Sequence, residues 1–201
     1  MAKEILNGYT GIKFNAVQIS NRLSDECLDF IPEFLNTGKR LLGFDMAPAN
    51  GGNISTRCGN GFLITASGCN LSSIENNEVI YVEDFSIEEK VVTYCGSLKP
   101  SSETFLHGLL YRERKDTLSA VHAHDAVATS MDLRNILCET EREEPYGTVE
   151  LAKLCLKTFT EENEIIVLKN HGYVAVGSSL AATTDIIIAM HNRLIKARGK
   201  L

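Results

Sequence analysis

The chain has 201 residues, with 20 lysines and arginines against 26 aspartates and glutamates, so its formal net charge is −6. Hydrophobic residues make up 44% and charged residues 23%, which excludes disorder over the bulk of the chain, because there is enough apolar surface to offset the entropy of ordering. The acidic balance excludes non-specific nucleic-acid binding, and the longest apolar runs are far shorter than the ~20 residues of a membrane span.

A helix is the first element that the sequence predicts, over residues 24–43. Apolar side chains recur there at helical spacing, from Leu28 to Leu42, as the buried face of an amphipathic helix requires. Pro32 lies inside this stretch, although proline is tolerated only at a break or in the first turn of a helix. We therefore expect Pro32 to mark one of these two features.

Short β-like runs replace the helical pattern between residues 51 and 94. They cover residues 62–65, 79–82 and 91–94, and clusters of Asn, Gly and Ser separate them. So few residues lie between successive runs that antiparallel pairing is favoured, because parallel strands need long crossover connections.

The second half of the chain alternates helices with strands. Helices are predicted from Pro100–Glu103 onward and over residues 126–133, 148–159 and 180–197, and strands over residues 118–122, 164–168 and 173–176. This order predicts an α/β fold with a largely antiparallel sheet that helices cover on both faces. No repeat or linker divides the sequence, so we expect a single domain over residues 1–201.

The six cysteines show no metal-binding or redox spacing, because no two of them are separated by only two residues. The first residues, Met1 to Gly8, contain no apolar core long enough for a secretory signal. Together these features predict a cytoplasmic protein whose cysteines are reduced and mostly buried.

Three histidines have the arrangement of candidate metal ligands. His122 and His124 are separated by one residue at the end of a predicted strand, so both side chains point to the same side and reach one ion. His171 interrupts a buried strand pattern just before Gly172 and is a candidate third ligand. Read alone, each of these histidine motifs favours a structural role. Asp125 either orients an imidazole or caps the following helix.

Serines, glycines and one glutamate form candidate anion-binding segments. Ser101, Ser102 and Glu103 begin a helix, where they cap free amides or present hydroxyls and N–H groups to a phosphate. His107 lies one turn later and is expected to hydrogen-bond Glu103. Residues 50–57 and 65–68 are glycine-rich breaks that serve either as tight turns or as anion-binding concavities.

These segments together favour one interpretation over the separate structural ones. Three histidines and one carboxylate match a catalytic Zn²⁺ site with room for a substrate. The serine- and glycine-rich segments match a phosphate pocket. A metal beside a phosphate pocket suits a phosphorylated hydroxy-ketone whose enolate is stabilised electrostatically.

The order of these motifs resembles the class II aldolase/adducin family over roughly residues 30–195. The motifs that carry the resemblance are Gly52-Asn53-Ile54-Ser55-x-Arg57, Leu63–Gly68, Lys99–Glu103 with His107, His122-Ala123-His124 and Asn170-His171-Gly172.

The resemblance implies a three-layer α/β/α sandwich, a homotetramer, and a zinc-dependent lyase of the fuculose-phosphate aldolase type. One Zn²⁺ per subunit would be held by His122, His124, His171 and Glu103, and Glu103 would also be the acid/base on the metal side. The substrate would be a small ketose phosphate, cleaved or formed through an enediolate of dihydroxyacetone phosphate. The residues implied in binding its phosphate are Gly52, Asn53, Ser67, Gly68, Ser101 and Ser102.

The chain departs from the family pattern in its tyrosines, which family aldolases use to protonate the aldehyde-derived oxygen. No tyrosine lies between Asp125 and Pro145, and Tyr173 is the only one after His171. A sugar-phosphate epimerase, dehydratase or decarboxylase of the same family is therefore the alternative activity. A non-catalytic adducin-like binding module would show degraded ligands, whereas all three histidines and Glu103 are present.

Overall fold

The structure is a computed structural model that describes residues 11–48, 50–133 and 136–198. Both ends of the expected 1–201 domain lie outside the described residues, and so does the segment Met1 to Gly8. In the first half of the chain the elements are β1 (Asn15–Ser20), α1 (Asp25–Leu28), α2 (Ile31–Leu42), β2 (Asn53–Cys58), β3 (Gly61–Thr65), the 3₁₀ turns η1 (Leu71–Ser73) and η2 (Asn76–Glu78), β4 (Val79–Ser86) and β5 (Val91–Cys95). In the second half they are α3 (Thr104–Glu113), β6 (Ser119–Ala123), α4 (Ala126–Thr129), α5 (Val149–Thr158), β7 (Ile165–Leu168), β8 (Gly172–Gly177) and α6 (Leu180–Arg198).

The strands form one mixed sheet in the order β1-β5-β4-β3-β2-β6-β8-β7. Its pairings are antiparallel except for β1 with β5, which is parallel. The expectation of a largely antiparallel sheet is thus only partly correct. The parallel pair is possible because about seventy residues separate its strands, ample for the crossover that parallel pairing needs.

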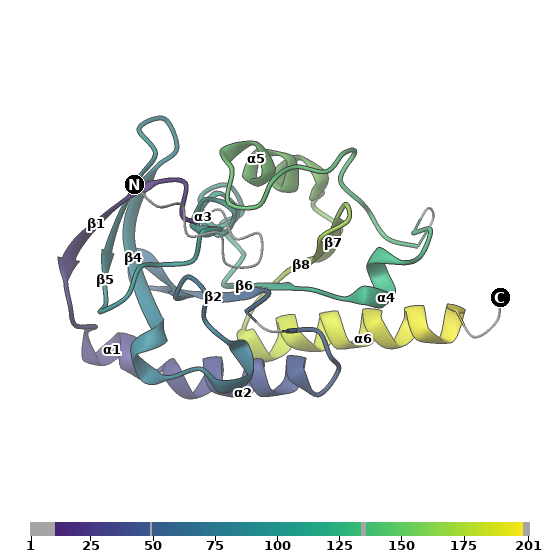
Figure 1. Cartoon of the computed structure of the whole chain (residues 1–201), viewed down its shortest axis with the longest axis horizontal. Helices are drawn as coiled ribbons and strands as arrows, with labels where there is room; N and C mark the ends of the chain where they lie inside the picture. The colour runs from purple at the N-terminus through teal and green to yellow at the C-terminus, as the bar shows by residue number, and fades with distance from the viewer. Residues whose placement is uncertain (1–10, 49, 134–135, 199–201) are drawn as a thin grey trace.

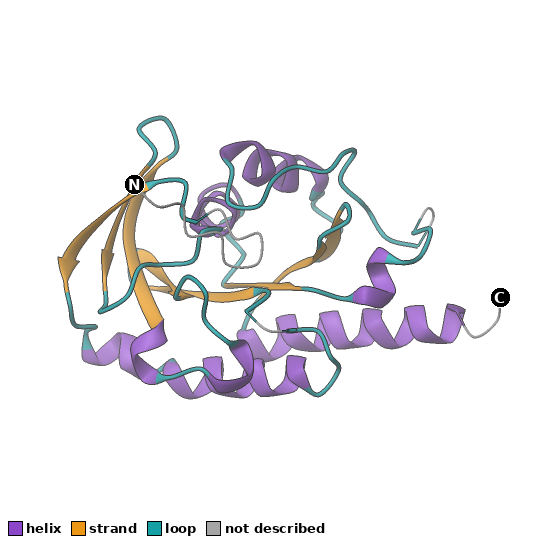
Figure 2. Ribbon diagram, viewed as in Figure 1, coloured by secondary structure: helices purple, strands orange, loops and turns teal. Residues whose placement is uncertain are grey.

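Helices lie on both faces of this sheet (Figures 1 and 2). α1, α2 and α6 run along one face, where Phe34, Leu41 and Ile187 belong to one buried apolar cluster. α3 and α5 cover the other face, where Leu110 and Leu151 belong to a second cluster. The site described below lies where β2 and β6 meet the start of α3.

Two predicted helices differ from the structure, and two strands have no counterpart among the predicted elements. The helix expected over residues 24–43 is two helices, and Pro32 stands in the first turn of the second, α2. The helix expected over residues 126–133 ends already at Thr129. Two strands were not predicted: β1, whose Val17 and Ile19 are exposed at the sheet edge, and β2, whose sequence is mostly polar although buried.

The cysteines are free, and Cys27, Cys58, Cys69 and Cys155 are buried, as expected. Burial raises the pKa of the Cys69 thiol to about 12, so it stays protonated near neutral pH. Among the described residues no helix has both the length and the apolar character that crossing a bilayer requires.

Candidate functional site

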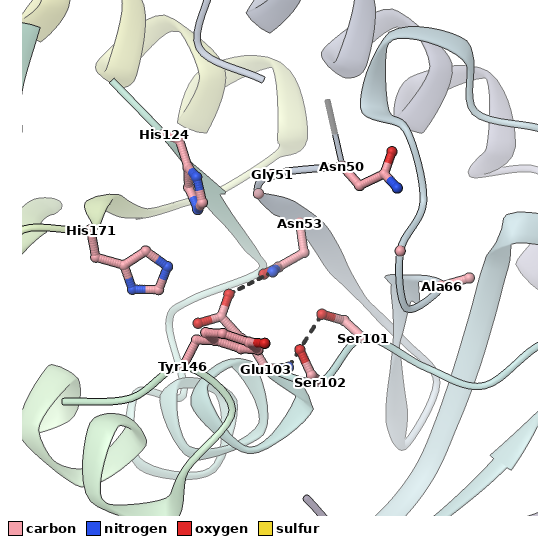
Figure 3. A pocket seen from close by; sticks show the side chains of 12 residues that line it. Asn50, Gly51, Asn53, Ala66, Ser101, Ser102, Glu103, His124, Tyr146 and His171 are labelled. Atoms are coloured by element: carbon pink, nitrogen blue, oxygen red, sulfur yellow. Dashed lines mark hydrogen bonds between the residues drawn. The ribbon is translucent and has the colours of Figure 1, made fainter. Parts of the chain in front are cut away.

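A cavity of about 190 Å³ brings together residues from distant parts of the sequence. Figure 3 shows His124 and His171 at one side, Ser101 and Ser102 at the other, and Glu103 between them. The residues that line it are Asn50, Gly51, Gly52, Asn53, Ala66, Gly68, Ser101, Ser102, Glu103, His124, Tyr146 and His171.

The three predicted histidines converge at this cavity. His122 is in β6, His124 follows that strand, and His171 lies in the turn between β7 and β8. One ring nitrogen of each lies within 4.8 Å of the others, close enough to share an ion. The imidazole centroids are 4.6 to 5.0 Å apart. The alternation of side chains along the strand therefore places His122 and His124 on the same side, as the sequence predicts. The turn between β7 and β8 supplies the third ring, that of His171.

The hydrogen bonds of His122 fix which of its nitrogens faces the cluster. Its Nδ1 donates to the backbone carbonyl of Tyr173 at 2.7 Å, so in the neutral ring Nε2 keeps its lone pair. That Nε2 lies 3.0 Å from Nε2 of His124. Such a carbonyl partner is the usual arrangement behind a metal-ligating histidine, because it fixes the tautomer.

Burial keeps the rings of His122 and His124 uncharged near neutral pH. It lowers the pKa of His122 well below its ordinary 6.5, with His171 and His124 adding to the effect. It likewise lowers the pKa of His124 to about 4, again helped by His171. Neutral imidazoles with converging lone pairs fit a divalent cation, because metal ligands must be deprotonated.

Glu103 stands at the N-cap of α3 and is almost fully buried. Its Oε2 accepts a hydrogen bond from Nδ2 of Asn53 at 2.7 Å and lies 3.5 Å from Nε2 of His122. Its Oε1 is buried without a hydrogen-bond partner among the described residues. A carboxylate with one oxygen held and the other unsatisfied in a cavity has the geometry of a general base.

The serine and glycine side of the cavity is built by backbone turns. Gly52 has φ +84°, and a Cβ there would come within 2.6 Å of the His122 carbonyl oxygen, so only glycine fits. Gly68 has φ +75° in open space. The Oγ of Ser101 accepts from the backbone N–H of Glu103 at 3.2 Å, as expected for a residue preceding a helix.

Two residues named from the sequence lie differently from the rest of the expected site. Ser67 is absent from the cavity lining and instead borders a separate hollow beside Phe14 and Lys99. The His107 side chain bonds Asn53 and Ser55, so it reaches Glu103 only through Asn53. Asp125 accepts a hydrogen bond from the N–H of Val127 at 2.7 Å and so caps α4, which is one of the two roles expected for it.

Tyr146 is the lining residue that sequence reasoning missed. The neighbouring Gly147 has φ +70°, and a Cβ there would meet the Ser102 carbonyl oxygen at 2.9 Å, so this turn packs tightly on the start of α3. Nζ of Lys13 donates to the Tyr146 carbonyl at 2.6 Å and lies 5.0 Å from its ring centroid. The Pro145-Tyr146-Gly147 turn signal was visible in the sequence, but nothing local placed it near Ser102.

Known proteins resemble this chain along most of its length. The sequence model of the Class II Aldolase and Adducin N-terminal domain matches residues 32–194. The L-fuculose phosphate aldolase of Methanocaldococcus jannaschii is 26% identical over 161 residues, 74% of this chain and 84% of that protein. The methylthioribulose-1-phosphate dehydratase of Pseudoalteromonas translucida is 25% identical over 178 residues, 75% of this chain and 81% of that protein.

The fold has close counterparts among solved structures. An L-fuculose 1-phosphate aldolase superposes with a TM-score of 0.70 and 23% identity, covering 88% of both chains. At this identity the likeness concerns the fold, and the chemistry has to be argued from the residues of the cavity.

Proposed function

Because the chain belongs to the class II aldolase and adducin N-terminal domain family, we propose that it is a metal-dependent lyase for a small ketose phosphate. The observation that carries this proposal is the convergence of His122, His124 and His171 on the cavity that Glu103 and the serines also line. Segments that are distant in the sequence thus supply the metal ligands, the base and the anion pocket of one site.

The residues of the histidine cluster fit a Zn²⁺ ion. One ring nitrogen of each of the three histidines lies within 4.8 Å of the others, which is close enough for all three to bind one ion. When bound, the ion supplies Lewis-acid polarisation of the substrate carbonyl. Three protein nitrogens also leave a position open for substrate, as catalytic zinc sites do.

Glu103 is the acid/base in this proposal. In the condensation direction its buried, unpartnered Oε1 would remove the proton next to the carbonyl of dihydroxyacetone phosphate, and in the cleavage direction it would return that proton to the carbanion. Its Oε2, 3.5 Å from His122, keeps the carboxylate beside the histidine cluster. The intermediate in this proposal is an enediolate of dihydroxyacetone phosphate, beside Glu103 and the histidine cluster.

The phosphate of the substrate is proposed to bind at the opposite side of the cavity. Ser101 and Ser102 offer hydroxyls at the start of α3, where the helix dipole favours an anion. Gly52 and Gly68 have no side chain, so the phosphate can come close to their backbone N–H groups. Asn53 lines the cavity, but its side-chain amide already bonds Glu103 and His107. Ser67 lies outside the lining, so phosphate binding is proposed for Ser101, Ser102, Gly52 and Gly68.

A dehydratase is the second candidate, and one observation favours it. Among the described residues the cavity lining contains a single tyrosine, Tyr146, and Tyr173 has its hydroxyl buried elsewhere. In an elimination of water Glu103 would remove the proton next to the carbonyl and return it to the leaving hydroxyl, so no second acid on the far side of the substrate is needed.

Product analysis separates the two reactions. Zinc-loaded protein is incubated with L-fuculose 1-phosphate and with 5-methylthioribulose 1-phosphate, and the products are followed by mass spectrometry. Release of dihydroxyacetone phosphate is the expected result and identifies the aldolase. Loss of one water without fragmentation identifies the dehydratase, and absence of turnover on both substrates contradicts the proposed function.

The wider setting is proposed from the same resemblance. We infer one domain over residues 1–201, assembled as a homotetramer that works on small sugar phosphates in the cytoplasm. Light scattering of the purified protein tests the assembly, for which the mass of four chains is expected. A monomer would contradict it.

A further inference from the structure

A continuous line of buried hydrogen bonds leads from the interior to the Glu103 carboxylate. The Tyr111 hydroxyl lies 2.7 Å from Ser55 Oγ, which lies 2.6 Å from Nδ1 of His107. Nε2 of His107 contacts Oδ1 of Asn53, whose Nδ2 reaches Glu103 at 2.7 Å. All five side chains are at most 5% exposed.

The spacing of the sequence explains why these residues meet. Glu103, His107 and Tyr111 recur every four residues on one face of α3, a rise of about 6 Å per step. Asn53 and Ser55 are two residues apart on one face of β2, a rise of about 6.6 Å. The two rises nearly match, so the helix and the strand can interleave their polar side chains without a gap.

The hydrogen bonds of this line have a defined direction. An ionised carboxylate only accepts, so Asn53 must present its Nδ2 to Glu103 and its Oδ1 to His107. An amide oxygen only accepts as well, so Nε2 of His107 carries the hydrogen. Burial lowers the pKa of His107 to about 4, so the neutral ring has an acceptor at Nδ1, 2.6 Å from the Ser55 hydroxyl, which also lies 3.3 Å from the Ala120 carbonyl. The Tyr111 hydroxyl continues the line, 2.7 Å from Ser55 Oγ.

We propose that Tyr111, Ser55, His107 and Asn53 form a positioning relay that holds Oε2 of Glu103 and leaves Oε1 as the oxygen that exchanges the substrate proton. This inference rests on the proposed function of Glu103. Nε2 of His107 and Nδ2 of Asn53 both donate in the direction of the carboxylate. The free Oε1 then takes its orientation from a chain of contacts that extends two helical turns away from the cavity.

The relay positions the base and does not deliver protons. The amide of Asn53 stands between His107 and Glu103, and an amide N–H does not dissociate as an imidazole or hydroxyl proton does. Proton exchange is thus confined to Oε1 and the substrate. His107 is a positioning residue because it touches neither the cavity nor the histidine cluster.

Two variants of His107 separate positioning from simple packing. His107→Leu removes the donor to Asn53, and we expect kcat to fall about 10- to 100-fold, as for other supporting partners of catalytic groups, with KM and zinc content nearly unchanged. His107→Gln keeps an N–H at the position of Nε2 and should recover most of kcat. Equal loss in both variants, or a loss confined to KM, would overturn the proposal.

Matched variants guard against misfolding. Leu109→Val trims buried volume from the same helix and removes no hydrogen-bonding group of the relay, so it should lower the melting temperature and leave kcat unchanged. If His107→Leu does not fold, Ser55→Ala replaces it, with a smaller loss of kcat expected at unchanged KM. A normal kcat in a folded Ser55→Ala protein with a disordered His107 ring would count against the relay.

A spectroscopic measurement tests the relay without any turnover. Ring ¹⁵N chemical shifts of His107 in the zinc-loaded protein at pH 7 should show hydrogen on Nε2 and none on Nδ1. The opposite tautomer would reverse the line of donors and overturn the relay. If the protein turns over no ketose phosphate although this tautomer is found, the proposed function fails while the directed hydrogen bonds stand.

Discussion

The two sides of the cavity are built in different ways. On the histidine side, buried side chains carry the geometry: His122 is fixed by the Tyr173 carbonyl, and Glu103 is held by Asn53. On the serine side, backbone turns carry it, with positive φ at Gly52 and Gly68. Substitutions on the first side should therefore change chemistry, and those on the second side should change binding.

The largest expected effect is loss of the metal in His124→Ala. Removing one of three neutral imidazoles should weaken zinc binding by orders of magnitude and abolish turnover, while the circular dichroism spectrum stays that of a folded protein. Zinc content per chain measures the effect. His191→Gln is the control variant. His191 bonds Asp125 and lies outside the histidine cluster, so this variant should keep its zinc. Full metal content in His124→Ala would show that His124 is no ligand.

Glu103→Gln should separate the base from the metal on the same side of the cavity. The amide keeps the shape of the carboxylate but has no basic oxygen, so turnover should fall by about 10²- to 10⁴-fold. Zinc content should stay near that of the wild type because three histidines remain. Turnover rates and metal analysis on one preparation measure both, and unchanged turnover would remove Glu103 from the reaction.

Ser102→Ala sharpens the comparison from the other side. A lost hydrogen bond to a charged group is worth about 1.5–3 kcal/mol, so KM for the phosphorylated substrate should rise by about 10- to 100-fold. Both kcat and zinc content should change little. Steady-state kinetics decides, and a fall in kcat at constant KM would mean that the serine side takes part in the chemistry.

The last prediction concerns the stability of the fold and its dependence on pH, with turnover left aside. Burial lowers the pKa of His107 from 6.5 to about 4, so between these values the unfolded chain binds a proton that the folded protein does not. The stability linked to His107 is thus complete above pH 6.5 and is lost as the pH falls toward 4, by up to about 3 kcal/mol. Denaturant unfolding of metal-free protein should lose more stability over this range in the wild type than in His107→Gln. Equal losses would contradict the burial of a neutral ring.

The parts of the site that depend on local spacing could be predicted from the sequence. His122 and His124 share a side because strand side chains alternate, and Ser101 to Glu103 precede a helix. His171 was recognisable because it interrupts an apolar strand pattern. The family resemblance is confirmed by the match over residues 32–194.

The remaining features depend on contacts between distant segments. β2 was overlooked because Asn53, Ser55 and Arg57 lack the apolar pattern of a buried strand, and their polarity makes sense only against α3. Tyr146 reaches the cavity because its turn packs on Ser102. β1 is an exposed edge strand without a buried face, so neither its existence nor its parallel pairing had a sequence signal.

Anomalous diffraction at the zinc absorption edge from crystals of zinc-loaded protein tests the central claim most directly. A single peak per chain is expected at about 2.0–2.1 Å from one nitrogen each of His122, His124 and His171, facing the cavity with Ser101 and Ser102. A zinc peak elsewhere, or none at these rings despite bound zinc, would contradict the metal centre and the lyase proposed around it.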